Sequence, residues 1–238
     1  MPIRTKQSKI EYITELSQST AHELSRNAEH WRDFLITAAA LYKYEFPDQL
    51  LIHAQRPDAT ACAELDIWNK RMNRYVNRGA KGIALIDDRG NAPRLRYVFD
   101  ISNTRPSRYG TSRTPYRWEV TEENTEHILS MLHNRYGVNN KYFTDAVKRS
   151  AERLVNDNLD EYVHEIMQSK ADSFMEEMDR VNIRKNFRDL AVNSVEYCVL
   201  TRFGYKADDF IPLDDFSAVC DFNTIDTMAV LGTAVSSL

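Results

Sequence analysis

Apolar side chains recur at helical spacing in the first part of the chain. Between residues 25 and 43 they lie three or four positions apart, and this period predicts an amphipathic helix. A second helix is predicted over 47–55, because Pro47 suits a first helical turn and the Arg56-Pro57 pair disfavours continuation. A third, short helix is predicted over about 60–72. The apolar positions of the first helix are Trp31, Phe34, Leu35, Ala38, Leu41 and Tyr42.

An alternating pattern further on predicts a β-hairpin, which is the only strong strand signal in the sequence. Residues 83–86 and 94–101 have the composition of strands and are joined by a polar turn around Gly90. Successive side chains of a strand point to opposite sides, so the side chains of the second strand form two faces. The apolar face predicts that Tyr97 and Phe99 belong to the core, and we expect the same of Trp68. The two faces are Arg94, Arg96, Val98 and Asp100 on one side, and Leu95, Tyr97, Phe99 and Ile101 on the other.

After this hairpin the pattern changes twice. Residues 102–117 are rich in Ser, Thr and Pro and show no hydrophobic period, which predicts a long exposed loop or crossing segment. Helical patterns then follow, and they predict a bundle. The stretch from Thr224 to Leu238 is apolar and helix-like without a stop signal, which indicates a longer version of the protein. The predicted helices cover 122–136, 139–156, 158–179 and 186–203.

These patterns predict a mainly α protein of the α+β class. N-terminal helices and a small antiparallel β-hairpin or sheet precede a helical bundle. We place the boundary between residues 1–118, as a nucleic-acid-binding region, and residues 119–238, as an acidic helical region. With 238 residues and 42% hydrophobic content, the chain can fill a core without disulfides.

Charge is distributed unevenly along the chain. The net charge is −4, but residues 66–118 hold 12 Lys and Arg against 4 Asp and Glu, whereas residues 119–238 hold 12 against 22. A basic block of this kind indicates contact with nucleic acid, because clustered cations displace the counterions condensed on phosphates. An alternative is that the basic block docks on the acidic half of the same molecule.

Motifs for catalysis are missing from the sequence. His22-Glu23 and His164-Glu165 lack the second histidine of a zinc-protease helix, and the glycines form neither a P-loop nor a dinucleotide-binding fingerprint. The three cysteines are widely spaced. We therefore expect no enzyme activity, no cofactor and no metal. The start of the chain does not have the pattern of a signal peptide, and no apolar run reaches the roughly 20 residues that span a bilayer, so we expect a cytoplasmic protein that does not enter membranes.

Cations and aromatic residues alternate between Trp68 and Trp118. This mixture suits unpaired nucleic acid, because each exposed base can stack on an aromatic ring for about 1–3 kcal/mol while cations follow the backbone. The arginine face of the second strand and the segment 105–118 are the strongest candidates. The predicted nucleic-acid-binding residues are Arg71, Arg74, Arg78, Lys81, Arg94, Arg96, Arg105, Arg108, Tyr109, Arg113, Tyr116 and Arg117.

Several short motifs between residues 31 and 87 carry a family resemblance. They are Tyr44-Glu45-Phe46 with Gln49, Ala54 to Ala59, Trp68, and Gly79 to Ile83. In these motifs the chain resembles the N-terminal region of ArdC-type antirestriction proteins and of large proteins from conjugative elements of Gram-positive bacteria. The resemblance implies a module that binds single-stranded DNA during transfer or shields incoming DNA from host defences. That family continues into a protease-like domain with an HExxH helix, which this sequence lacks.

Three functional hypotheses follow. The first is a single-stranded-DNA-binding accessory or anti-defence protein of a mobile element, without catalysis. The second is an inhibitor of a host defence nuclease, either a restriction enzyme or a CRISPR effector, whose acidic helices imitate phosphates. The third is a helical scaffold within a larger polypeptide that has no independent activity.

Overall fold

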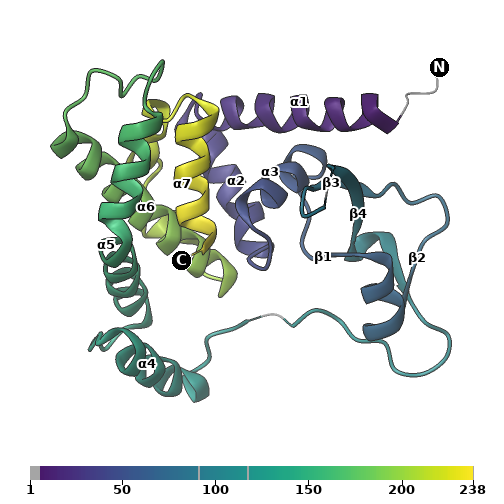
Figure 1. Ribbon diagram of the computed structural model, residues 1–238. Helices are drawn as coiled ribbons and strands as arrows, with labels where there is room; N and C mark the ends of the chain where they lie inside the picture. The colour runs from purple at the N-terminus through teal and green to yellow at the C-terminus, as the bar shows by residue number, and fades with distance from the viewer. Residues whose placement is uncertain (1–5, 91, 117, 238) are drawn as a thin grey trace. The chain divides into compact units, whose positions relative to one another are not determined.

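The computed structural model describes residues 6–90, 92–116 and 118–237 (Figure 1). Helices account for most of the regular structure, and two small antiparallel sheets account for the rest, so the predicted mainly α fold of the α+β class is confirmed. The chain forms two compact units. The N-terminal unit contains the described residues up to Thr20 together with Ala40–Tyr116, and the C-terminal unit contains Ala21–Ala39 and the described residues after 117.

The predicted hairpin and the first two predicted helices are present. Helix α1 (Lys6–Leu24) runs from the N-terminal unit into the C-terminal unit, and α2 (Ala28–Ala40) follows it. The predicted helices over 25–43 and 47–55 correspond to α2 and α3, and the predicted strands correspond to β3 and β4. After α2 the N-terminal unit contains α3 (Phe46–Gln55), β1 (Cys62–Ala63), the π-helical turn η1 (Ile67–Arg71), β2 (Arg74–Val76), β3 (Ile83–Asp87), β4 (Arg94–Asp100), the 3-10 turn η2 (Ile101–Asn103) and β5 (Thr104–Pro106).

The predicted helix over 60–72 begins later than predicted. Residues 65–71 are helical and include the short π-helical turn η1, whereas the residues before them are extended and form β1, which pairs with β4. The cause lies outside the segment, because the Asp100 carboxylate accepts backbone N–H hydrogen bonds from Thr60 at 2.8 Å and Ala61 at 2.9 Å. These hydrogen bonds hold the backbone at Thr60 and Ala61 in an extended conformation, which is incompatible with a helix there. Trp68 is buried, as predicted.

The larger sheet packs against a helix to form the core of the N-terminal unit. Strand β4 lies between β1 and β3, and all its pairings are antiparallel. The face toward α3 buries Leu85 and Val98 completely, and Ile52 of α3 belongs to the same cluster. Burial of each such side chain contributes about 1.5–3 kcal/mol. This apolar layer holds the sheet against the helix.

The core lies on the opposite face of β4 from the predicted one. Val98 is fully buried, whereas Tyr97 is 44% exposed and Phe99 is partly buried. The predicted core position of Tyr97 is therefore wrong. The face toward α3 can accept Arg96 because Asp48 of α3 forms an ion pair with its guanidinium. A charge paired in this way avoids most of the cost of burial alone.

The C-terminal unit is a helical bundle, as predicted. In Figure 1, helices α5, α6 and α7 lie side by side. Trp31 of α2 is fully buried in this unit and donates its indole N–H to the hydroxyl of Ser194 at 2.9 Å. No helix among the described residues has both the length and the apolar character needed to cross a bilayer. The unit contains α4 (Glu122–Tyr136), α5 (Phe143–Ser169), α6 (Arg180–Arg202), the 3-10 helices η3 (Ala207–Asp209) and η4 (Leu213–Asp221), and α7 (Ile225–Ser237).

Two helix boundaries in this unit differ from the prediction. One helix, α5, replaces the predicted helices over 139–156 and 158–179, because the buried residues Val155, Leu159 and Val163 keep the helical period across the predicted break. It ends at Ser169, before the predicted end at 179. Helix α6 begins at Arg180, earlier than predicted. The Asp179 carboxylate accepts the backbone N–H groups of the first turn and fixes that start.

Asp100 joins three segments of the N-terminal unit. Besides Thr60 and Ala61, it accepts hydrogen bonds from the backbone N–H of Ser102 at 2.9 Å and from its hydroxyl at 2.6 Å. Burial by itself would raise the pKa of Asp100, but these hydrogen bonds outweigh burial and hold the pKa below its usual value. The ionised carboxylate is therefore the form that stabilises the fold.

Replacing Asp100 by Asn is expected to lower the free energy of unfolding at neutral pH by about 3 kcal/mol. Both carboxylate oxygens accept N–H groups, so either orientation of the amide would point an NH2 group at a donor. Because the folded-state pKa is depressed, this stabilisation is present above about pH 4 and is lost as the pH falls through the folded-state pKa. Urea denaturation across that range measures the difference. Equal stabilities at neutral pH would contradict the role of Asp100.

Candidate nucleic-acid interface

Two stretches of the chain that contain no acidic residue come together through β2 and β5. We call residues 67–82 and 101–116 the basic ribbon, because they contain 8 Lys and Arg and no Asp or Glu. Strands β2 and β5 pair antiparallel, and a bond of 2.8 Å from Asn77 N–H to the Asn103 carbonyl extends the pairing. Stretches separated in sequence by the β3–β4 hairpin thus lie side by side along β2 and β5. The cations of the ribbon are Lys70, Arg71, Arg74, Arg78, Lys81, Arg105, Arg108 and Arg113.

One face of the paired strands is buried. Arg74 is only 9% exposed, and its Nε donates to the Thr104 hydroxyl at 2.8 Å. This predicted binding residue therefore fastens β2 to β5 and does not present its charge to solvent. On the opposite face, Tyr75 lies across from Arg105 in the register, and both are exposed.

Asn73 organises the turn that follows β5. Its backbone is left-handed, with φ of +50°, a conformation that asparagine tolerates better than most residues. Its side-chain amide donates to the Tyr109 carbonyl at 2.8 Å, and its own carbonyl accepts from Ser107 N–H at 3.0 Å and from the Ser112 hydroxyl at 2.7 Å. The loop predicted over 102–117 is therefore partly strand β5 and partly a turn folded onto Asn73. Sequence analysis did not identify this residue.

Six cations of the ribbon remain available to a ligand. They are exposed, and within the described part of the chain none of them forms an ion pair. Lys70 differs, because it pairs with Asp66 at 2.8 Å. The predicted Tyr109 and Tyr116 are 86% and 83% exposed, and Arg117 lies outside the described residues. The six available cations are Arg71, Arg78, Lys81, Arg105, Arg108 and Arg113.

The two predicted arginines of β4 are engaged by carboxylates. Arg94 contacts Asp87 at 3.1 Å, and Arg89 contacts the same residue at 3.0 Å. The hydrogen bonds from the Arg89 side chain lower the pKa of Asp87, which therefore stays ionised. Arg96 lies between Asp48 and Glu64, with the latter contact at 3.8 Å. A cation held in this way releases few counterions on binding a phosphate, so we leave both arginines out of the candidate interface.

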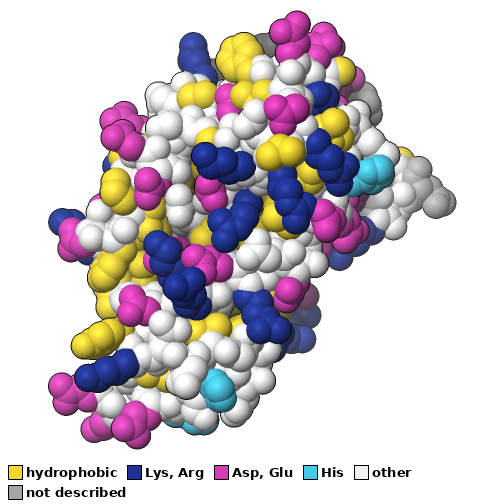
Figure 2. Space-filling view, turned by 90° about the vertical axis from the view of Figure 1, so that its left-hand side faces the viewer, with side chains coloured by type: hydrophobic (Ala, Val, Ile, Leu, Met, Phe, Trp, Pro, Cys, Tyr) yellow, Lys and Arg dark blue, Asp and Glu magenta, His cyan; other side chains and the backbone are white. Residues whose placement is uncertain are grey.

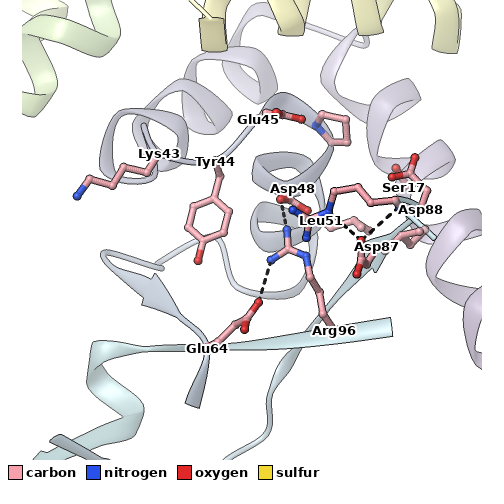
Figure 3. Close-up of a pocket in the computed structure, with 13 residues that line it drawn as sticks. Ser17, Lys43, Tyr44, Glu45, Asp48, Leu51, Glu64, Asp87, Asp88 and Arg96 are labelled. Atoms are coloured by element: carbon pink, nitrogen blue, oxygen red, sulfur yellow. Dashed lines mark hydrogen bonds and ion pairs between the residues drawn. The ribbon is translucent and has the colours of Figure 1, made fainter. Parts of the chain in front are cut away.

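Arg96 also lines a pocket of about 590 Å³ in the N-terminal unit (Figure 3). Figure 3 shows its guanidinium between Asp48 and Glu64, and Tyr44 lines the same pocket. Burial raises the pKa of Asp48, and Arg96 offsets part of that effect. Five carboxylates and three cations line the pocket, so it does not favour a phosphate. These residues are Glu45, Asp48, Glu64, Asp87 and Asp88, with Lys43, Arg89 and Arg96.

Several cations of the C-terminal unit pair with carboxylates. Figure 2 shows the side of the molecule formed in part by α5, where Lys and Arg side chains alternate with Asp and Glu. Arg149 pairs with Glu152 at 2.8 Å, and Arg184 pairs with Asp160 across α5 and α6. The basic ribbon differs in that it contains no carboxylate of its own, and Asp66, just before it, pairs with Lys70.

The chain matches no family model, no curated protein and no solved structure. The described residues contain no group of three or more His, Cys, Asp or Glu side chains arranged to hold a metal ion.

Replacing Asn73 by Asp is expected to loosen the turn at residues 107–113, because it removes the amide donor but keeps the size and the tolerance for a left-handed backbone. The backbone N–H groups of Ser107 and Arg113, which donate to Asn73 and Met72, should exchange with solvent faster by about tenfold, as expected for a loss of about 1.4 kcal/mol.

Hydrogen exchange followed by mass spectrometry measures this change. The Asn77→Asp variant is the matched control, since its side chain forms no hydrogen bond with this turn. Unchanged exchange in the Asn73→Asp variant would show that the turn does not depend on the amide.

Proposed function

We propose that this protein binds single-stranded DNA through the basic ribbon and does so without catalysis. The observation that carries the proposal is the group of six exposed cations with no carboxylate in the ribbon to neutralise them. Cations in such a surface displace counterions from a phosphate backbone, which is the main source of affinity for nucleic acid. The β4 arginines, and cations of α5 and α6 such as Arg149 and Arg184, lack this property because carboxylates pair with them.

The preference for single strands is supported by aromatic side chains on the ribbon. Tyr109 and Tyr116 project from the segment that follows β5 and are more than four-fifths exposed. Bases in a duplex are stacked on one another, whereas an unpaired base can stack on such a ring. A surface that combines free cations with exposed rings therefore suits an unpaired strand.

The proposed role is binding, in the cytoplasm, as an accessory or anti-defence protein of a mobile element. The ribbon contains no carboxylate, imidazole or thiol, which are common ligands of protein-bound metal ions and include the most frequent general base, the imidazole. The role in a mobile element depends on the resemblance of residues 31–87 to ArdC-type proteins, and it is independent of the binding proposal.

Reversing three ribbon cations tests the interface. The triple variant Arg71→Glu, Arg78→Glu and Arg105→Glu should weaken binding of a fluorescent thymidine oligonucleotide by about 100-fold or more, because it replaces attraction to phosphate by repulsion. Fluorescence anisotropy at constant ionic strength gives the dissociation constants. Circular dichroism of both proteins checks that the variant is folded.

The matched control makes the same change in charge on the C-terminal unit. Lys148→Glu, Arg180→Glu and Lys185→Glu replace three exposed cations of α5 and α6, and this variant should retain affinity within about threefold, since only long-range repulsion changes. A larger loss in the control than in the ribbon variant would place the interface on the C-terminal unit and refute the proposal.

A second candidate function is inhibition of a host defence nuclease by imitation of nucleic acid. The segment 207–238 has six Asp and no Lys or Arg. Four of these, Asp208, Asp209, Asp214 and Asp215, are exposed on or beside the 3-10 helices η3 and η4. A row of carboxylates can occupy the basic channel in which a restriction enzyme or a CRISPR effector holds its substrate.

Cleavage assays distinguish this second candidate from DNA binding. An inhibitor that occupies the nuclease keeps its effect when non-specific single-stranded DNA is added in excess, whereas a DNA-binding protein is titrated away. Changing the four exposed aspartates to asparagine should then abolish the inhibition of a restriction enzyme or a CRISPR effector. If the wild-type protein inhibits neither the restriction enzyme nor the CRISPR effector, inhibition by imitation of nucleic acid is ruled out for these two enzymes.

A further inference from the structure

Tyr75 stands apart from the other exposed tyrosines of the ribbon. It lies in the middle of β2 and directly opposite Arg105 of β5. Tyr75 is 45% exposed, whereas Tyr109 and Tyr116 are 86% and 83% exposed. Protein therefore covers more of Tyr75 than of the other two tyrosines.

A ring that is partly held loses less freedom when a base stacks on it. Immobilising a free side chain at an interface costs about 0.5–1.5 kcal/mol, which is comparable to the gain from stacking one base. Tyr109, which is 86% exposed, would bear most of that cost on binding. The cost is smaller for Tyr75, which lies within a paired strand and is less exposed.

We propose that Tyr75 is the stacking platform through which the ribbon selects unpaired bases, with the adjacent Arg105 contacting the phosphate of the same strand. This inference rests on the proposed function and adds the residue that determines strand preference. Opposed residues of an antiparallel pair have Cβ atoms about 4.5–5.5 Å apart, so a ring and a guanidinium there can reach the base and the phosphate of one nucleotide. In a duplex the base is not accessible, and only the arginine contact remains.

The opposite face of the ribbon supports the same assignment. Arg74 and Thr104 lie there, are buried, and are joined by the 2.8 Å hydrogen bond. The strands therefore cannot turn Tyr75 inward without exposing a buried polar pair. The strand pairing therefore fixes the face on which Tyr75 lies before any ligand binds.

An abasic oligonucleotide separates the two contacts, because it retains the phosphates and lacks the bases. The wild-type protein should bind a thymidine strand more tightly than an abasic strand of equal length. Tyr75→Ala should reduce affinity for the thymidine strand by about tenfold or more and leave affinity for the abasic strand and for a duplex within about twofold. Arg105→Ala should weaken binding of all three ligands.

Two further variants keep the test decisive. Tyr75→Phe retains the ring and should bind as the wild type does, which separates stacking from any role of the hydroxyl. Tyr142→Ala removes a tyrosine that is 62% exposed in the C-terminal unit, and it should have no effect.

Equal loss of affinity for all three ligands in Tyr75→Ala would show that the residue supports the ribbon and does not stack, and unchanged affinity for the thymidine strand would also overturn the inference. In both cases the proposed function would stand. Failure of the wild-type protein to bind any of the three ligands would overturn the proposed function and this inference together.

Discussion

The pairing of β2 with β5 places two acid-free stretches of the chain side by side, and the candidate interface depends on it. Each strand has only three residues, so backbone hydrogen bonds alone would hold them weakly. Two side-chain contacts stabilise the pairing. The Arg74 guanidinium donates a hydrogen bond to the Thr104 hydroxyl, and the Asn73 amide donates to the turn that follows β5. Without this pairing, the basic segments on either side of the β3–β4 hairpin would not form one surface.

The arginines of the N-terminal unit have two physically distinct roles. Those near the core are engaged, either by a carboxylate, as Arg96 is by Asp48, or by a hydroxyl, as Arg74 is by Thr104. The exposed arginines of the ribbon surface form no ion pair within the described residues, and they retain their hydration and counterions. Because binding to phosphate is driven by release of those counterions, the number of basic residues in a segment matters less than where its carboxylates lie.

Local patterns predicted the elements that depend on local physics. The period of α2, the proline at the start of α3 and the alternation in β3 and β4 were sufficient for those elements, and the basic block from 66 to 118 was visible in the sequence. Sequence could not show which face of β4 would meet α3, because the carboxylate that pairs with Arg96 on that face, Asp48, belongs to another element. For that reason the prediction placed Tyr97 in the core. Sequence also could not show β2, β5 or the role of Asn73, since three-residue strands and a left-handed turn are fixed by contacts distant in sequence.

The salt dependence of binding tests most directly whether the ribbon cations contact phosphates. The affinity of the wild-type protein for a thymidine oligonucleotide should be measured by anisotropy across a range of potassium chloride concentrations. If the six available cations each contact a phosphate, the logarithm of the association constant should fall against the logarithm of salt concentration with a slope of about −4. A slope near zero, or no binding at low salt, would contradict an interface made by these cations.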